Sequence, residues 1–346
     1  MHDTATSIEV RQLSKRFHSF TAIDDLSFSI KQGQVVGFLG PNGAGKSTTM
    51  RILCGILPAT AGFVSICGIP VASQPQAAKR HIGYMPENNP LPDHMRVEEY
   101  LRFRARLKEI PSNKIAERVE NVMEICDLQH KGRRKIIGSL SKGYCQRVGI
   151  AEALLADPEI IIMDEPTIGL DPHQVLAFRE LIQNLGKHRT LVISSHILAE
   201  VEHYCDRVII INQGHIIADG TPEALSQEFI QHESFHLEVA GEPDTVRRIL
   251  NTIDDSISVN TISPPDAQGF FNVRLSTSAA SGTQTGEHIL TLLNREKDIR
   301  VRTFYPHRFD LENIFLAATR RDWREKQATD IKPLATDSDR SETSIK

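Results

Sequence analysis

The sequence predicts an α/β protein with a largely parallel sheet in its main domain and a smaller α+β domain after it. Up to about residue 230, short apolar runs alternate with helical stretches, a pattern typical of a parallel sheet with helices on its faces. Beyond that point the apolar residues alternate with polar ones in strand-like fashion. The length of 346 residues suits about two domains.

Three apolar strands are predicted to end in polar residues, and they define the main sheet. They lie at 34–40 (QVVGFLG), 159–166 (EIIIMDEP) and 190–196 (TLVISSH). A helix is expected directly after the first of them, and a hairpin at 206–220 with Gln213 and Gly214 as its turn. Since the carboxyl ends of parallel strands meet at one edge of a sheet, chemistry is expected at that edge.

Two segments depart from this alternation. Between about 96 and 136 the pattern is wholly helical and rich in charge, which indicates a helical insert in a domain spanning 7–230. From 233 the predicted order is βαββαβ, a ferredoxin-like arrangement, and a further helix at about 310–319 completes a domain at 233–320. The polar composition of 321–346 predicts a disordered tail.

Composition narrows the function classes. Forty basic residues against 44 acidic ones give a net charge of -4, which argues weakly against a nucleic-acid partner. The five cysteines are scattered, odd in number and without a CxxC pair, as expected of reduced thiols in a cytosol. No apolar run approaches the roughly 20 residues that cross a bilayer, and the N-terminus lacks the features of a signal peptide. If the protein acts at a membrane, it is therefore expected to do so without entering the lipid.

The segment GPNGAGKST predicts a phosphate-binding loop. It matches G-x-x-x-x-G-K-[ST], follows a strand and opens a helix, which is the context that the motif requires. Lys46 is expected to reach the β- and γ-phosphates of a nucleotide, and the Ser47 hydroxyl to ligate Mg²⁺. A chance glycine-rich turn is disfavoured because strand, loop and helix agree. The predicted nucleotide-binding residues here are Gly40, Pro41, Asn42, Gly43, Ala44, Gly45, Lys46, Ser47 and Thr48.

Two other strand ends supply groups for catalysis. Asp164 and Glu165 end the second strand, where Asp164 suits a Mg²⁺ contact and Glu165 a general base for an attacking water. His196 ends the third strand and can contact the γ-phosphate or that water. Alone, each residue is as compatible with an ordinary surface position. Beside the phosphate-binding loop, the catalytic interpretation with Lys46, Glu165 and His196 is favoured.

Over about residues 8–225, these motifs in this order resemble the ATP-binding subunit of an ABC transporter. LSKGYCQ at 140–146 takes the place of the family's signature motif, TIGLD at 167–171 matches its D-loop, and SSH carries its switch histidine. The resemblance implies an ATP hydrolase that dimerises head to tail, as a homodimer or heterodimer, with ATP between one subunit's phosphate-binding loop and the other's signature. Ser141 and Gly143 would then contact the partner's γ-phosphate, and Asp171 would lie at the dimer seam.

Three departures from the family pattern stand out. Lys142 and Tyr144 occupy signature positions where the family has glycine and glutamine. Glu87 aligns with the family's Q-loop glutamine, and its carboxylate could ligate Mg²⁺ while adding negative charge. The aromatic residue that stacks on adenine is usually tyrosine, and here Phe17 is its expected counterpart, with Phe20 as the rival.

GYMPENNPL, EEYL, the lysine-bearing signature and FDLENIFLAATR are most similar to an export-type branch of gliding-motility-type, drug and polysaccharide exporter subunits. This resemblance implies a subunit at the cytoplasmic face of the cell membrane that powers a separate permease, gripped by the helical insert. Two alternatives stay open. One is a soluble ABC-type ATPase acting on nucleic acid or ribosomes, and the other is a regulatory module that binds ATP without hydrolysis. The presence of Glu165 and His196 disfavours the second.

Overall fold

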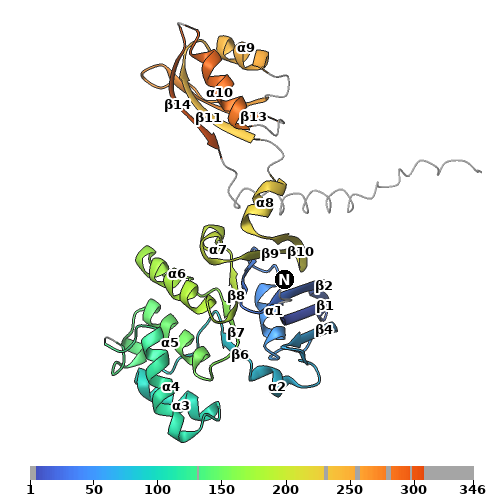
Figure 1. Ribbon diagram of the computed structural model, residues 1–346, viewed down its shortest axis with the longest axis vertical. Coiled ribbons are helices and arrows are strands. Elements are labelled where there is room, and N and C mark those ends of the chain that lie inside the picture. The colour runs from blue at the N-terminus through green and yellow to red at the C-terminus, as the bar shows by residue number, and fades with distance from the viewer. Residues whose placement is uncertain are drawn as a thin grey trace, which may run out of the picture.

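The computed structural model describes residues 5–130, 132–229, 233–253, 258–277, 282–296 and 298–307. Its central element is a six-stranded sheet with the strand order β10-β9-β3-β8-β7-β6 (Figure 1). The parallel strands are β3 (Val35–Leu39), β6 (Ile82–Met85), β7 (Ile160–Asp164), β8 (Thr190–Ser195) and β9 (Arg207–Asn212). β10 (His215–Gly220) pairs antiparallel with β9. The largely parallel sheet and the hairpin predicted from the sequence are thereby confirmed.

A second, antiparallel sheet corrects the expectation for the first 31 residues. Its order is β2-β1-β4-β5, with β1 (Thr6–Phe17), β2 (Phe20–Lys31), β4 (Ala61–Ile66) and β5 (Ile69–Pro70). β1 and β2 are long strands with no helix between them, whereas short strands alternating with helices were expected. The register shifts beside Gln12 and Asp25, both with positive φ, interrupt the apolar alternation. The two strands are therefore not recognisable from a regular alternating pattern in the sequence.

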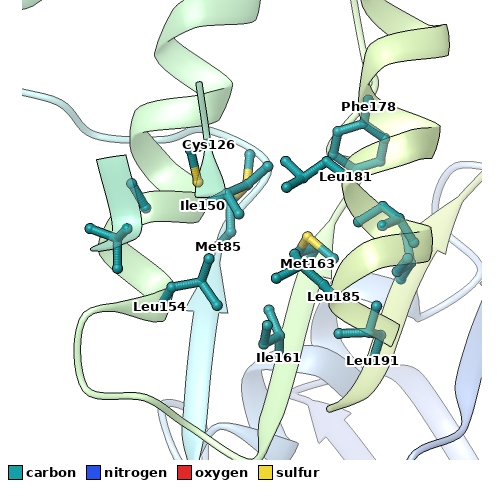
Figure 2. Packing of buried hydrophobic residues seen from close by; sticks show 14 of the residues in the cluster. Met85, Cys126, Ile150, Leu154, Ile161, Met163, Phe178, Leu181, Leu185 and Leu191 are labelled. Carbon is teal, nitrogen blue, oxygen red and sulfur yellow. The ribbon is translucent and has the colours of Figure 1, made fainter. Parts of the chain in front are cut away.

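Apolar side chains cover both faces of the six-stranded sheet. Along β7, Ile160 and Ile162 join a core shared with the antiparallel sheet and α1 (Lys46–Leu53). Ile161 and Met163 face the other core, against α5 (Lys142–Leu154) and α6 (Pro172–Gly186) (Figure 2). A strand buried on both faces is held in one register. That register fixes Asp164 at the carboxyl edge of the sheet.

The predicted helical insert contains α3 (Val97–Leu107) and α4 (Ser112–Ile125). Its two ends meet at an isolated bridge between Arg96 and Ile136, and a short 3-10 helix (Ile137–Ser139) leads on to α5. The remaining helices are α2 (Pro75–Lys79), α7 (Leu198–Tyr204) and α8 (Pro222–Phe229). Among the described residues, no helix is both long and apolar enough to cross a membrane.

The C-terminal elements follow the predicted βαββαβ order. They are β11 (Glu233–Ala240), α9 (Pro243–Ile253), β12 (Ser258–Ile262), β13 (Phe270–Thr277), α10 (Gly282–Leu293) and β14 (Arg300–His307). Their antiparallel sheet has the order β12-β13-β11-β14, the ferredoxin-like arrangement expected from the sequence. The helix expected at about 310–319 and the tail at 321–346 lie outside the described residues, and the domain boundaries stay predictions.

Candidate nucleotide-binding site

The loop between β3 and α1 leads into a helix start that no side chain caps. Gly45 caps α1 with φ 109°, and no side chain caps the helix. A Cβ at Gly45 would lie 2.7 Å from the Ala22 carbonyl oxygen, so only glycine fits both the backbone conformation and the space. The uncapped N–H groups of the first turn and the positive end of the helix dipole favour an anion such as phosphate.

Lys46 lies in this first turn and is buried. Its Nζ donates hydrogen bonds to the carbonyl oxygens of Gly40 (2.7 Å) and Pro41 (3.2 Å) and lies 3.1 Å from Oε1 of Glu165. The side chains of Lys46 and Glu165 are only 6% and 7% exposed. Despite the short distance, Oε1 of Glu165 accepts no hydrogen bond from the residues described. The buried Glu165 carboxylate is thus held by its ion pair with Lys46, and it can accept a proton from a small ligand such as water once Lys46 moves away.

Asp164 connects the first turn of α1 with the strand ends. Its Oδ1 accepts hydrogen bonds from the hydroxyls of Ser47 (3.1 Å) and Ser194 (2.6 Å). A hydroxyl and a carboxylate side by side are the oxygen ligands that Mg²⁺ prefers, so Ser47 and Asp164 fit that ion. Ser194 was missed by the motif analysis, although a serine closing a buried apolar strand indicates a polar partner at the strand end.

Glu165 and His196 are in direct contact. Oε2 of Glu165 lies 2.7 Å from Nδ1 of His196, and the Glu165 backbone N–H donates to the Ser194 hydroxyl at 2.8 Å. Glu165 has φ 49°, a left-handed conformation that is unfavourable for a non-glycine residue and concentrated at functional sites. The structure thus brings five predicted site residues together, namely Lys46, Ser47, Asp164, Glu165 and His196.

Glu87 is exposed beyond the end of β6, and among the described residues it makes no hydrogen bond or ion pair. The structure therefore does not bring it to Ser47 and Asp164. The same loop is tied to α5 by Asn89, whose Nδ2 donates to the Cys145 carbonyl oxygen at 3.1 Å. A Cβ at Gly149 would lie 2.1 Å from that Nδ2. A glycine inside the apolar helix was the available sequence signal for this close approach.

Ser141 starts α5 as an exposed N-cap whose side chain makes no capping hydrogen bond. Gly143 is buried under α6, since a Cβ there would lie 2.7 Å from Cδ of Gln174. Gln174 in turn donates its backbone N–H to the side chain of Asp171 (2.9 Å), which caps α6. The signature helix and the D-loop are thus packed into one unit.

Lys142 adds a contact that the family pattern lacks. A Cβ at Gly169 would lie 2.4 Å from Lys142 Nζ, so the ammonium group rests on the D-loop where Gly169 has φ 72°. α5 packs against α3 and α4, whereas α1 packs against β2, β4 and β7 (Figure 1). The two open helix starts therefore belong to different parts of the chain.

Phe17 and Phe20 face each other across the turn between β1 and β2. Their exposed fractions are 42% and 59%, so both rings are accessible for stacking. Nζ of Lys15 lies 4.9 Å from the centroid of the Phe17 ring. This cation–π contact places a positive charge beside the ring expected to stack on adenine.

Comparison with known proteins agrees with this geometry. The family model described as ABC transporter matches residues 23–168. Nod factor export ATP-binding protein I of Burkholderia orbicola (strain AU 1054) is 37% identical over 224 residues, which cover 64% of this chain and 73% of that protein. A solved structure described as the ATP-binding subunit of an ABC transporter is 32% identical, with a TM-score of 0.58, and covers 64% of this chain and 93% of its own.

A second solved structure is cbiO1 from Clostridium perfringens, described as part of the ABC transporter complex cbiONQ. It is 27% identical, with a TM-score of 0.59, and covers 72% of this chain and 95% of its own. The sequence identity and coverage of these relatives, together with the phosphate-binding loop and the acidic strand end, show that the chain belongs to the ATP-binding subunits of ABC transporters, a family of ATPases.

Proposed function

We propose that this ATPase powers a separate membrane permease of the export type, and that Lys46, Ser47, Asp164, Glu165 and His196 carry its reaction. The observation that carries the proposal is the convergence of these five side chains at the carboxyl edge of the sheet, beside an uncapped helix start. This is the arrangement that phosphoryl transfer from a nucleoside triphosphate requires.

ATP binding is proposed to exchange the partners of Lys46. Without nucleotide its ammonium group lies 3.1 Å from Glu165. The β- and γ-phosphates, held by the N–H groups at the start of α1, offer stronger and more highly charged acceptors. Moving Lys46 to these phosphates releases the Glu165 carboxylate, so substrate binding itself frees the general base. Phe17 would stack on the adenine ring, with Phe20 as the alternative.

The cation of this site would be held by Ser47 and Asp164, with Glu87 as a further carboxylate if its loop closes. When bound, Mg²⁺ supplies neutralising charge to the β- and γ-phosphate oxygens. Ser194 keeps the Asp164 carboxylate in place through its 2.6 Å hydrogen bond. Asn89 fixes the Glu87 loop to α5, so movement of this loop is linked to the signature helix.

For hydrolysis, Glu165 accepts a proton from a water whose oxygen attacks the γ-phosphorus. The bond between the γ-phosphorus and the β–γ bridging oxygen breaks, and its electron pair leaves with ADP. The proton on Glu165 then passes to the released phosphate. His196, 2.7 Å from Oε2, would orient the carboxylate and contact the γ-phosphate. General-base catalysis of this kind contributes typically about 10²–10⁴-fold in rate.

The site is proposed to be completed by a second subunit, identical or related. Ser141 is the exposed N-cap of α5 and makes no capping hydrogen bond, while Gly143 lies beneath Gln174. The buried side chains of α5 and α1 belong to different hydrophobic cores. In a head-to-tail dimer this second phosphate-binding helix start would face the partner's γ-phosphate, with Asp171 at the seam. The contacts of Gln174 with Gly143 and of Lys142 with Gly169 would transmit closure from the signature to the D-loop.

The permease is proposed to bind the helical insert and the Glu87 loop at the cytoplasmic face of the membrane. The Burkholderia orbicola relative is named for Nod factor export, and cbiO1 is described as part of a transporter complex. Both names support a membrane partner for this chain. No described feature favours nucleic acid or ribosomes as the partner.

Affinity capture from native cells tests the permease proposal. The tagged chain carrying Glu165→Gln, with ATP to hold the dimer closed, should retain an integral membrane protein through detergent solubilisation. Glu223→Gln serves as the matched control, because Glu223 is an exposed glutamate in α8 outside the site. This control should capture the same membrane protein and keep full ATPase activity. Recovery of ribosomes or nucleic acid without any integral membrane protein would contradict the proposal.

A further inference from the structure

Three side chains from distant segments meet at the edge of the main sheet opposite the nucleotide site. Oε2 of Glu159 lies 2.8 Å from Nδ1 of His81 and 3.2 Å from Sγ of Cys67. All three potential ligand atoms lie within 4.8 Å of one another. Glu159 directly precedes β7 and His81 directly precedes β6, while Cys67 lies in the turn between β4 and β5.

From this juxtaposition we infer that Cys67, His81 and Glu159 bind a divalent transition-metal ion of the zinc class. Thiolate, imidazole and carboxylate are the ligands that Zn²⁺ takes in proteins, and the sulfur disfavours Mg²⁺ and Ca²⁺. The two negative ligands balance the charge of the ion. None of the three residues belongs to the proposed ATP reaction, so the inference does not depend on it.

The backbone holds each ligand in place before any ion arrives. The Cys67 N–H donates to the Ser7 carbonyl oxygen at 2.7 Å, and the Thr190 N–H donates to the Glu159 carbonyl oxygen at 3.0 Å. The Ile160 N–H donates to the His81 carbonyl oxygen, also at 3.0 Å. A site whose ligands are positioned by sheet hydrogen bonds needs little reorganisation to bind a metal.

The conformation of the turn between β4 and β5 gives no reason for a cysteine at position 67. Cys67 and Gly68 have φ of 49° and 76°, the two left-handed positions of a tight hairpin turn. Asn-Gly or Asp-Gly is preferred there, because short polar side chains tolerate positive φ. Cysteine has no such advantage, whereas its sulfur at this point reaches the Glu159 carboxylate.

Distances and access suit a three-ligand site. With bond lengths of about 2.0–2.3 Å, tetrahedral ligands are roughly 3.3–3.7 Å apart, so the 2.8 and 3.2 Å contacts need to open only slightly. Glu159 is 59% and His81 31% exposed, which leaves a path for the ion and a fourth position for water. Binding breaks the Cys67 S–H bond and releases its proton to solvent. In the metal-free protein Nδ1 of His81 donates its proton to Glu159, so neutral His81 must shift that proton to Nε2 before Nδ1 can bind the ion.

A reactive thiol explains the cluster less well. Burial, together with the hydrogen bond to Glu159 and the charge of that carboxylate, raises the pKa of Cys67 to about 12. The thiol therefore keeps its proton in the metal-free protein and is a poor nucleophile.

Cobalt provides the test, because Co²⁺ occupies zinc sites and reports thiolate ligation optically. The chelator-treated, nucleotide-free full chain is titrated with Co²⁺ alone. We expect a saturable sulfur-to-cobalt charge-transfer band in the near ultraviolet, intense visible bands of tetrahedral Co²⁺, and loss of both when Zn²⁺ is added. Zn²⁺ alone should raise the melting temperature. Absence of the charge-transfer band at saturating Co²⁺ overturns the inference.

Variants assign the ligands. Cys67→Ser should abolish the charge-transfer band, and Glu159→Gln should weaken Co²⁺ binding by on the order of 10–100-fold or more. Because the Glu159 side chain is mostly exposed, this variant folds even where Cys67→Ser does not. Cys145→Ser is the matched control, since Cys145 is another half-buried free thiol, and its band should remain. A band that survives in Cys67→Ser, or binding unchanged in Glu159→Gln, contradicts the site.

Discussion

Lys46 and Glu165 form a buried ion pair, in which the proposed phosphate-binding cation neutralises the proposed general base. Their atoms are 3.1 Å apart, and His196 holds the other carboxylate oxygen. A buried charge without its partner is strongly unfavourable. The pair therefore stabilises the site without nucleotide, and under the proposed mechanism its separation by phosphate would couple ATP binding to the availability of the base.

Glu165→Gln should separate binding from chemistry. The amide keeps the size of the side chain but is a poor base, so steady-state ATP hydrolysis should fall by about 10²–10⁴-fold. Fluorescent-nucleotide titration should show ATP binding retained, and size-exclusion chromatography with ATP should show a persistent dimer. The exposed Glu223→Gln serves again as control. Wild-type hydrolysis by the Glu165 variant would show that another group is the base.

Lys46→Ala should remove ATP turnover and most ATP binding, and it should also destabilise the protein. It leaves Glu165 buried without its cation, which costs about 3 kcal/mol. Chemical denaturation should show this loss largely relieved in the double variant Lys46→Ala/Glu165→Gln, because the amide carries no charge. Additive destabilisation in the double variant would mean that the two side chains do not interact.

At the scale of elements, Glu98 joins two arginines of the helical insert through hydrogen bonds. Glu98 in α3 accepts hydrogen bonds from Arg133 (2.9 Å) and from Arg102 (2.9 Å), and Arg133 also pairs with Glu120 of α4 at 2.8 Å. Together with the bridge between Arg96 and Ile136, these contacts fix both ends of the segment proposed to hold the permease.

Because of this network, the stability of the helical insert is expected to depend on pH. The hydrogen bonds from Arg133 and then Arg102 lower the pKa of Glu98 from 4.5 to about 2. A lowered pKa means that the carboxylate's contribution is complete above about pH 4.5 and is lost as the pH falls toward 2. Glu98→Gln should cost about 1 kcal/mol at neutral pH, since two partly exposed ion pairs are lost.

Urea denaturation at neutral pH and at pH 3 measures this contribution. The difference between wild type and Glu98→Gln should shrink at the lower pH, because at pH 3 the Glu98 carboxyl is protonated in the unfolded state and must lose that proton on folding. Glu99→Gln is the control, because Glu99 is its neighbour in α3 and its contacts with Arg96 are exposed. Glutamine can still accept the capping hydrogen bond from the Arg96 backbone N–H. A difference that is the same at both pH values would contradict the role of the carboxylate charge.

Features set by a few consecutive residues could be predicted from the sequence, whereas contacts between segments far apart in the chain could not. The phosphate-binding loop and the Asp164–Glu165 strand end were predictable, because their motifs lie within a few consecutive residues. The contacts of Asn89 with α5 and of Gln174 with Gly143 were not, because they join segments brought together only by the fold. Glu87 was expected near Mg²⁺, but it is exposed, and Asn89 joins its loop to α5 rather than to Ser47 and Asp164. The bulged strands β1 and β2 were missed because irregular register breaks the alternation.

On the scale of the whole molecule, the central claim is that the ATP site is completed in trans. Ser141 at the start of α5 is exposed and uncapped, and the buried side chains of α5 and α1 belong to different hydrophobic cores. Ser141 is a better position to test than Gly143. The Gly143 site lies under Gln174, so a side chain there would disturb α6, whereas Ser141 is exposed and makes no capping hydrogen bond.

Mixing two inactive variants tests this claim most directly. Ser141→Arg should bind ATP at its own loop yet hydrolyse it slowly, because the added bulk blocks closure against the partner. Mixed with Lys46→Ala, it should recover up to about a quarter of wild-type activity, since half of randomly paired dimers are mixed and each has one intact site of two. The measurement is the steady-state ATPase rate of each variant alone and of the mixture. Hydrolysis at the wild-type rate by Ser141→Arg alone would contradict a site shared between subunits.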